Sequence, residues 1–317
     1  AAGRVGGAAG LRRRPRWTFI VVVGSPQGAP LVKHRPWLIP ALFMLGLGIS
    51  VIMVLRSQTG TDQFNLLRGG WILLTERRLQ PYGNPMSGGG HEPGGLTSLI
   101  VGLPLFVWQD FRAVNFTVLM THVLAYALLD RMARDALSPF ARLLVCILYW
   151  LNPWRLYFSA YLWNPNYLFV LGAVHAWTAH TQRNRAGFGC SFFHILAIGF
   201  AFQLHGSFLI LVIASVLLAH RGYMKVDWRG AAVAAILIAL SLVPWLQASI
   251  QHPEILPVQT GFLGRGLVTM YPLLRGVLYW LRYPVIFFSG QTTLFDFTPA
   301  LGAAADRVLT PAIDILI

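Results

Sequence analysis

Long apolar runs alternate with short polar intervals along most of this chain. The first run, residues 37–55, is long enough to cross a bilayer as a helix. Six later runs are predicted to form further helical spans, over residues 112–129, 140–151, 167–180, 188–202, 207–219 and 231–246. Gln203, His205 and Gly206 interrupt the stretch 188–219, which favours two short helices there over one long helix. The pattern predicts an all-α polytopic membrane protein.

The longest polar interval, residues 56–95, separates the first span from the rest of the hydrophobic body. Within it, residues 62–80 are predicted to form an amphipathic helix that lies at the membrane interface. Its apolar positions recur at helical spacing, namely Phe64, Leu67, Trp71 and Leu74. We expect Thr59 or Thr61 to cap this helix.

The end of this helix and the next apolar run complete the predicted loop. Arg77 and Arg78 are expected to close the last turn of the helix. Residues 96–108 follow, and this run is short for a span and is interrupted by Gly102 and Pro104. We therefore expect it to form a second interfacial or re-entrant helix.

Charge gives this pattern an orientation. The 317 residues are 56% hydrophobic and 11% charged, whereas soluble domains carry about 25% charged residues. Much of the net charge of +14 sits in short basic clusters between apolar runs, at residues 130–142, 181–187 and 220–230. The positive-inside rule places such clusters in the cytoplasm, so residues 56–95 face the outer side and residues 96–108 do not cross. This distribution also argues against nucleic-acid binding.

The two ends of the chain receive separate assignments. Residues 1–36 are basic and are predicted to form a cytoplasmic tail, before a transmembrane domain over residues 37–317. Residues 250–290 are predicted to form an outer, periplasmic loop, in which residues 271–288 form either an interfacial helix or a poor span. The apolar end at Ile317 carries no basic terminus, and this favours further spans beyond it.

Four polar clusters converge on the predicted outer face. Their members are Asp62 and Gln63; His91 and Glu92; Trp163, Asn164 and Asn166; and Gln203 and His205. Polar groups at the edge of hydrocarbon are costly and usually functional, so this is where we expect a site.

Each cluster also has a purely structural interpretation. Asp62 could serve only the first turn of its helix, and Asn164 could cap a helix that starts near Pro165. Gln203 and His205 could satisfy the backbone at the helix break, and Trp163 could stack on a sugar or anchor at the interface.

Recognised metal and nucleotide motifs are missing from the sequence. His91, Glu92 and His205 lack the spacing of a metal site, so we expect no cofactor and no divalent metal. The glycine-rich residues 88–95 follow no predicted strand, which argues against a nucleotide site.

Four stretches together resemble the GT-C class of integral-membrane glycosyltransferases. They are GTDQFNLLRGGWILLTERRLQPYG after the first span, HEPGGLTSLIVGLPL, YLWNPN and FQLHGS. The likeness covers residues 37–285 and is nearest to the family 39-type branch, which contains protein O-mannosyltransferases, aminoarabinose transferases and rhizobial galacturonosyltransferases. It rests on the order and spacing of the stretches.

The resemblance implies a GT-C-like helix bundle in the bacterial inner membrane, with its active site on the periplasmic face. Such enzymes move a sugar, with inversion, from a polyprenyl-phosphate donor to a lipid, glycan or protein acceptor. Asp62 would be the catalytic base or would orient the acceptor, and Gln63 replaces a second acid that is frequent in relatives. The other members of the four clusters would bind substrate. Candidates for the donor phosphate are Arg68, Arg155, Arg265 and Arg275, together with Arg56 and Arg112.

Two other functions stay open from sequence. A transporter or flippase of lipid-linked sugars would show paired broken helices and a site near the midplane. A non-catalytic relative could have kept the fold, and Gln63 is compatible with that alternative.

Overall fold

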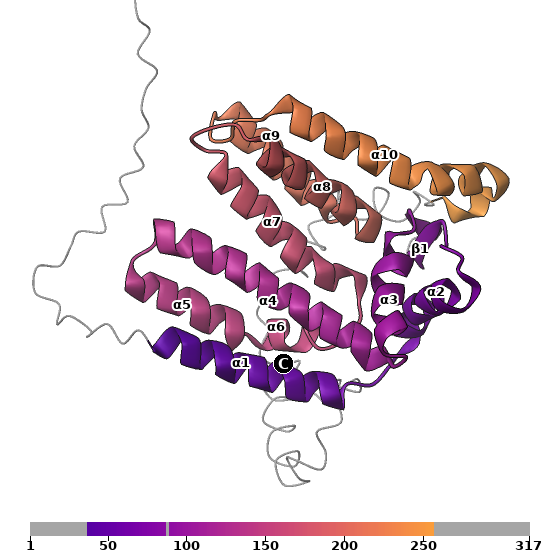
Figure 1. Ribbon diagram of the computed structural model, residues 1–317, viewed down its shortest axis with the longest axis horizontal. Helices are drawn as coiled ribbons and strands as arrows, with labels where there is room; N and C mark the ends of the chain where they lie inside the picture. Colours follow the sequence, from indigo (N-terminus) through magenta and orange to yellow (C-terminus); the bar gives the residue numbers. More distant parts are fainter. Residues whose placement is uncertain (1–36, 87–88, 257–317) are drawn as a thin grey trace, which may run out of the picture. The chain divides into compact units, whose positions relative to one another are not determined.

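The computed structural model describes residues 37–86 and 89–256, and this part of the chain is mostly helical (Figure 1). The helices are α1 (Leu38–Arg56), α2 (Thr61–Glu76), α3 (Leu96–Val107), α4 (Phe111–Ala136), α5 (Pro139–Trp150), α6 (Pro153–Phe158), α7 (Leu168–Thr181), α8 (Phe188–Leu204), α9 (Phe208–His220) and α10 (Trp228–Gln251). Two 3-10 turns, η1 (Asn164–Tyr167) and η2 (Pro253–Ile255), and two strands, β1 (Tyr82–Pro85) and β2 (His91–Pro93), complete it. The predicted cytoplasmic tail, residues 1–36, lies outside the described residues. So does most of the predicted periplasmic loop 250–290, which contains Arg265 and Arg275.

Within residues 37–86 and 89–256, three helices are long and apolar enough to cross a membrane: α1, α4 and α10. The other predicted spans also form helices, but α5, α7, α8 and α9 have only 12 to 17 residues. The predicted break between two short helices is confirmed, because α8 ends at Leu204 and α9 begins at Phe208. The predicted short helix at residues 96–108 is α3, which has 12 residues.

Helix α4 runs further than the sequence suggested. We expected residues 130–142 to form a basic loop, but α4 continues to Ala136 and α5 starts at Pro139. The reason is the buried Asp130, whose carboxylate accepts bonds from Arg134 Nη2 at 2.7 Å and from Arg142 Nε at 2.6 Å. These two cations satisfy the acid and let the helix continue through a charged sequence.

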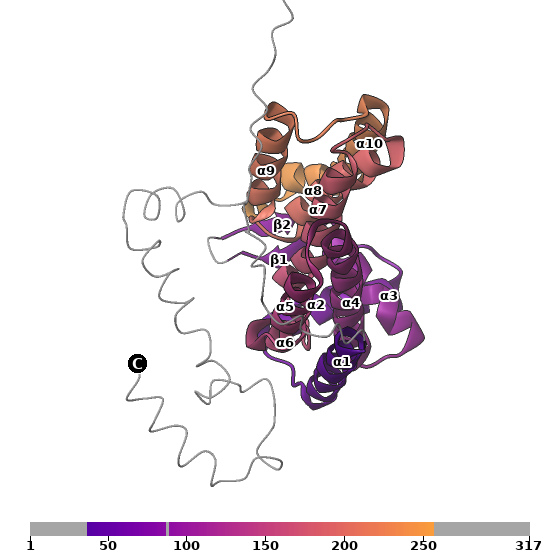
Figure 2. The same cartoon turned by 90° about the vertical axis from the view of Figure 1, so that its left-hand side faces the viewer.

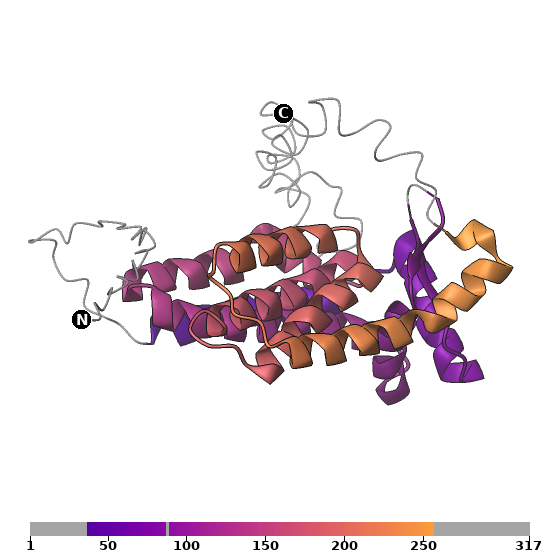
Figure 3. The same cartoon turned by 90° about the horizontal axis from the view of Figure 1, so that it is seen from above.

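The helices pack as two groups that meet along α4 and α7. Helix α1 contacts α4, α5 and α6, while α8 contacts α7, α9 and α10. At one end of these helices, α2, α3 and the β1–β2 hairpin lie together and contact the ends of α4 and α8 (Figures 1 and 3). Figure 2 shows the hairpin from a second direction, beside α8, which β2 contacts. The ends of α1 and α4 that lead into this layer are joined by a bond from Asn115 Nδ2 to Ser57 Oγ of 2.8 Å.

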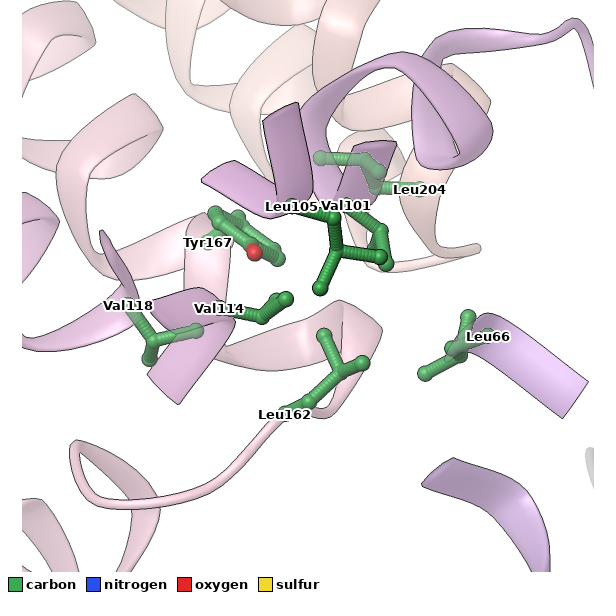
Figure 4. Close-up of a cluster of buried hydrophobic side chains, with 8 residues drawn as sticks. All are labelled: Leu66, Val101, Leu105, Val114, Val118, Leu162, Tyr167 and Leu204. Atoms are coloured by element: carbon green, nitrogen blue, oxygen red, sulfur yellow. The ribbon is translucent and has the colours of Figure 1, made fainter. Parts of the chain in front are cut away.

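A cluster of buried apolar side chains fixes this layer to the longer helices (Figure 4). Its members come from α2, α3, α4, α8 and the segment before α7: Leu66, Val101, Leu105, Val114, Val118, Leu162, Tyr167 and Leu204. Because each element contributes at least one side chain, the polar residues on the same elements are held in a fixed arrangement.

The ends of α2 differ from the prediction. Gly60, rather than Thr59 or Thr61, is the N-cap, and its backbone amide donates to Gln63 Oε1 at 2.8 Å. Arg77 does not extend the helix, because it adopts a left-handed conformation (φ 54°) that reverses the chain after Glu76.

The hairpin was not predicted from sequence. Strands β1 and β2 pair antiparallel, and Gly89 and Gly90 have the positive φ that the turn between them needs. The glycine-rich stretch therefore does follow a strand, but the strand belongs to a two-stranded hairpin and not to the strand–turn–helix unit that binds a dinucleotide.

Helices α2 and α3 pack so closely that side chains are excluded between them. A Cβ atom on Gly70 would lie 2.6 Å from Val101 Cγ1 and 2.9 Å from the backbone nitrogen of Gly102. Gly70→Ala is therefore expected to lower the free energy of unfolding by about 1–3 kcal/mol, because backbone cannot move aside cheaply. The test is the thermal unfolding of the purified protein in detergent.

Gly48→Ala on α1 is the matched control. A Cβ there meets nothing within 4 Å, and alanine is the better helix former by about 0.8–1.0 kcal/mol. We expect this variant to be at least as stable as the wild type. Equal melting temperatures for the two variants would contradict the tight α2–α3 contact.

Candidate functional site

A buried carboxyl group lies where the hairpin meets the segment before α7. Glu92 on β2 is 8% exposed, and Asn164 in η1 donates to it through Nδ2. The backbone amide of Asn84 on β1 also donates to this carboxyl. Burial raises the pKa of Glu92 to about 8, although both hydrogen bonds act in the opposite direction. The group is therefore mostly protonated at neutral pH.

The residues around the Glu92 carboxyl carry further polar atoms. Gly83 has no side chain, and a Cβ placed on it would lie 3.2 Å from Thr97 Oγ1 and 3.4 Å from Glu92 Oε2, so both atoms face the same spot. Thr97 Oγ1, Asn164 Oδ1 and Asn84 Oδ1 are buried, and none has a hydrogen-bond partner among residues 37–86 and 89–256. We call Asn84, Glu92, Thr97 and Asn164 the Glu92 group.

Gln203 connects this region to the helices behind it. It is 1% exposed, its Nε2 donates to Ser241 Oγ on α10 at 2.9 Å, and its side chain packs against Gly94. Gly94, in the turn between β2 and α3, has a φ of +82°, which residues with a side chain rarely adopt. A side chain at this position would also collide with Gln203. The structure thus places Gln203 against the Gly94 turn, two residues from Glu92.

Asp62 lies in the first turn of α2, and its residue is exposed. The carboxylate of Asp62 lies close enough to Tyr161 to affect its pKa. Burial is the main cause that raises the pKa of Tyr161, and the Tyr157 hydroxyl and the negative charge of Asp62 raise it further. Tyr161 is three residues before Asn164. Residues 161–164 therefore contact Glu92 through the side-chain amide of Asn164 and lie near Asp62 through Tyr161.

Several predicted site residues are engaged in local structure. Gln63 accepts a hydrogen bond from the Gly60 amide, and His91 Nδ1 is 2.9 Å from Gly83 O. Asn166 donates a hydrogen bond to Tyr161 O at 2.8 Å. His205 Nδ1 accepts a hydrogen bond from the Ser207 amide at 3.2 Å. Trp163 stacks on Phe158 with 5.3 Å between ring centroids. The alternative interpretation of Asn164 as a helix cap does not apply, because Trp163 is the N-cap of η1 and the Asn164 side chain donates to Glu92.

The two described arginines among the four primary phosphate candidates differ sharply. Arg68 on α2 is exposed. Arg155 is 2% exposed, and its guanidinium donates to Tyr149 O, Trp150 O, Ser50 Oγ and Ser159 Oγ at 2.6–3.2 Å. Burial lowers the pKa of Arg155 to about 10, so it remains charged. We therefore revise Arg155 from a phosphate ligand to a structural cation that holds the end of α5 against α1.

Sequence reasoning missed Asn84, Thr97 and the role of Gly83. Thr97 lies only two residues after the HEPGG stretch, but the apolar sequence of α3 does not indicate that this hydroxyl is buried near Gly83 and Glu92. Within the described residues, no three His, Cys, Asp or Glu side chains gather as metal ligands.

Comparison with protein-family models, with curated proteins and with solved structures finds no match to this chain.

Proposed function

We propose that this protein is an integral-membrane glycosyltransferase, which takes a sugar from a polyprenyl-phosphate donor and transfers it, with inversion, to a lipid, glycan or protein acceptor. The observation that carries the proposal is the pair of acids on either side of residues 161–164. Asp62 is exposed near Tyr161, and Glu92 is buried against Asn164. We place the site on the periplasmic face of a bacterial inner membrane.

The two acids are suited to different tasks. An inverting displacement needs one carboxylate to accept the proton of the acceptor hydroxyl. Asp62 is exposed to solvent in the first turn of α2, where an acceptor hydroxyl can reach it. Glu92 is buried among polar atoms and is suited to holding a substrate in position.

The lengths of the neighbouring helices support a site below the membrane surface. Helices α7 and α8, whose ends carry η1 and Gln203, have 14 and 17 residues. At about 1.5 Å per residue they are roughly 21–26 Å long, less than a hydrocarbon core of about 30 Å. A site at their outer ends would be reached both by a lipid-linked donor from the bilayer and by an acceptor from the periplasm.

The donor phosphate needs a cation, and the candidates among the described residues are Arg56, Arg68 and Arg112. Arg68 is exposed on α2, and Arg112, at the start of α4, lies 3.4 Å from Asp110. An exposed guanidinium can bind a phosphate through two parallel hydrogen bonds. Arg265 and Arg275 stay candidates outside the described residues.

The direct test is transfer by the purified protein in liposomes. Polyprenyl phosphates that carry different radiolabelled sugars are supplied, and the label is followed into lipid, glycan and protein fractions. Transfer from at least one donor supports the proposal. Movement of intact donor between leaflets without transfer would show a flippase, and neither activity would show a non-catalytic membrane protein.

A further inference from the structure

We propose that the Glu92 group is the subsite for the transferred sugar, and that it selects an uncharged sugar rich in hydroxyl groups over a uronic acid or an amino sugar. This inference rests on the proposed glycosyltransferase function and names the substrate class of the same site. It follows from which hydrogen-bonding atoms the group leaves open and from the charges around it.

The open atoms of the group call for hydroxyl groups. Asn84 Oδ1 and Asn164 Oδ1 can only accept a hydrogen bond, and Thr97 Oγ1 can accept or donate one. All three are buried, and the part of the chain that the structure describes supplies none of them with a partner. A buried acceptor without a donor costs roughly 1–3 kcal/mol, so a ligand that brings several donors would gain from binding here. Adjacent hydroxyls of a sugar ring are such donors.

A carboxylate on the sugar would not fit these atoms. A uronic acid brings two further acceptor oxygens and a negative charge to a place already lined by carbonyl-type oxygens. Among the described residues, the groups acting on the Glu92 carboxyl are Asn164 and the Asn84 amide, and no arginine or lysine is among them. Moving an unpaired charge into such a buried place is strongly unfavourable.

An ammonium group on the sugar would meet a related obstacle. It would have to be paired with an ionised carboxylate, but burial raises the pKa of Glu92 to about 8 and keeps the group protonated at neutral pH. A protonated Glu92 donates one hydrogen bond and accepts others, as a hydroxyl-rich ligand requires.

Titratable side chains on the packed elements do not change this balance. On β1, β2 and η1 they are Tyr82, His91 and Tyr167, and α3 carries none. Helix α2, which packs against β1, carries Asp62, Arg68 and Glu76, and α8, which packs against β2, carries Cys190 and His194 and is followed by His205. His91 is hydrogen-bonded to Gly83 O and its ring contacts the Tyr82 ring at a tilt, Tyr167 is in the apolar cluster, and His205 is hydrogen-bonded to Ser207. None of these side chains is among the groups that shift the pKa of Glu92, which are Asn164 and the Asn84 amide beside burial itself.

The experiment compares donors and variants in the same preparation. Short-chain polyprenyl phosphates carrying glucose, mannose, galactose, glucuronic acid or 4-amino-arabinose are tested for stabilisation of the purified protein against heat and for transfer of label. We expect the neutral hexoses to exceed the two charged sugars by at least about tenfold in apparent affinity, as expected for a charge brought into a buried polar site.

Variants of the group then link this selectivity to its atoms. Thr97→Val removes one hydroxyl at constant shape and is expected to weaken the neutral donors about tenfold. Thr75→Val on the exposed end of α2 is its control, because that hydroxyl is bound to Trp71 O. Glu92→Gln is expected to remove the loss of wild-type activity above pH 8, where Glu92 ionises and each further pH unit costs about tenfold. Glu76→Gln, an exposed acid paired with Arg78, should leave that loss in place.

The outcomes separate this inference from the proposed function. Neutral-sugar preference that is weakened by Thr97→Val, with an alkaline loss that disappears in Glu92→Gln, supports the subsite. Preference for either charged donor, or a Thr97→Val variant with unchanged affinity and selectivity, overturns the subsite while the glycosyltransferase proposal stands. No binding and no transfer of any donor by the wild type overturns both.

Discussion

Asp62→Asn is expected to lower the rate of sugar transfer by about a hundredfold or more. The variant keeps the shape of the side chain but cannot accept the proton of the acceptor hydroxyl, and positioned general bases contribute about 10²–10⁴-fold to a rate. Asp62 sits at the start of α2, and its side chain takes no part in the Gly60–Gln63 cap, so the fold should persist. The measurement is the initial rate of label transfer at saturating donor.

Two comparisons make this result specific. Glu76→Gln removes an acid from the other end of the same helix and should leave the rate within about twofold, because an exposed ion pair contributes little. The melting temperature of Asp62→Asn should match the wild type within a few degrees. Full transfer activity in Asp62→Asn would assign the base to another group, and Glu92 would be the first to examine.

Arg155→Met is expected to reduce the free energy of unfolding by about 3–5 kcal/mol, or to prevent accumulation of the folded protein. The substitution leaves Tyr149 O, Trp150 O and Ser50 Oγ without the donors that Arg155 now supplies. Removing the charged member of a buried network costs about this much because the remaining polar atoms stay desolvated. The guanidinium also stacks on Trp150 at 4.5 Å, a contact that methionine does not replace.

Arg134→Met is the control for the loss of an arginine. Its side chain is 63% exposed, and Arg142 continues to pair with Asp130 when it is removed. We expect it to cost less than about 1 kcal/mol. Arg155→Lys should give an intermediate loss, since lysine keeps the charge but not the planar fork of donors. A stable Arg155→Met protein with weakened binding of the donor phosphate would restore the phosphate role that we have withdrawn.

Much of the fold was predictable because it follows from apolar periodicity. The seven runs assigned as spans all form helices, and the polar residues 203–206 do end one helix before the next begins. Helix ends were less predictable, since Gly60 and Arg77 terminate α2 through backbone conformation that no local apolar pattern encodes. The β1–β2 hairpin was not predicted because its strands are too short to show an alternating pattern of apolar and polar residues.

The candidate site was predictable only in outline. The sequence pointed to Glu92, Asn164 and Gln203 as polar residues at helix ends, and the structure brings Asn164 to Glu92 and Gln203 to the adjacent turn at Gly94. The sequence offered no reason to select Thr97. It suggested Arg155 as a ligand of the donor phosphate, a role that the buried contacts of Arg155 do not support.

The sequence by itself determined a mostly helical, membrane-associated chain with a polar loop after its first span, because burial of apolar runs depends on composition and period alone. The tertiary structure decided which polar side chains meet. Asn164 and Glu92 are 72 positions apart, and Arg155 reaches Ser50 over 105 positions. Contacts over such separations depend on how helices pack, so the protonation of Glu92 and the burial of Arg155 could be known only from the folded chain.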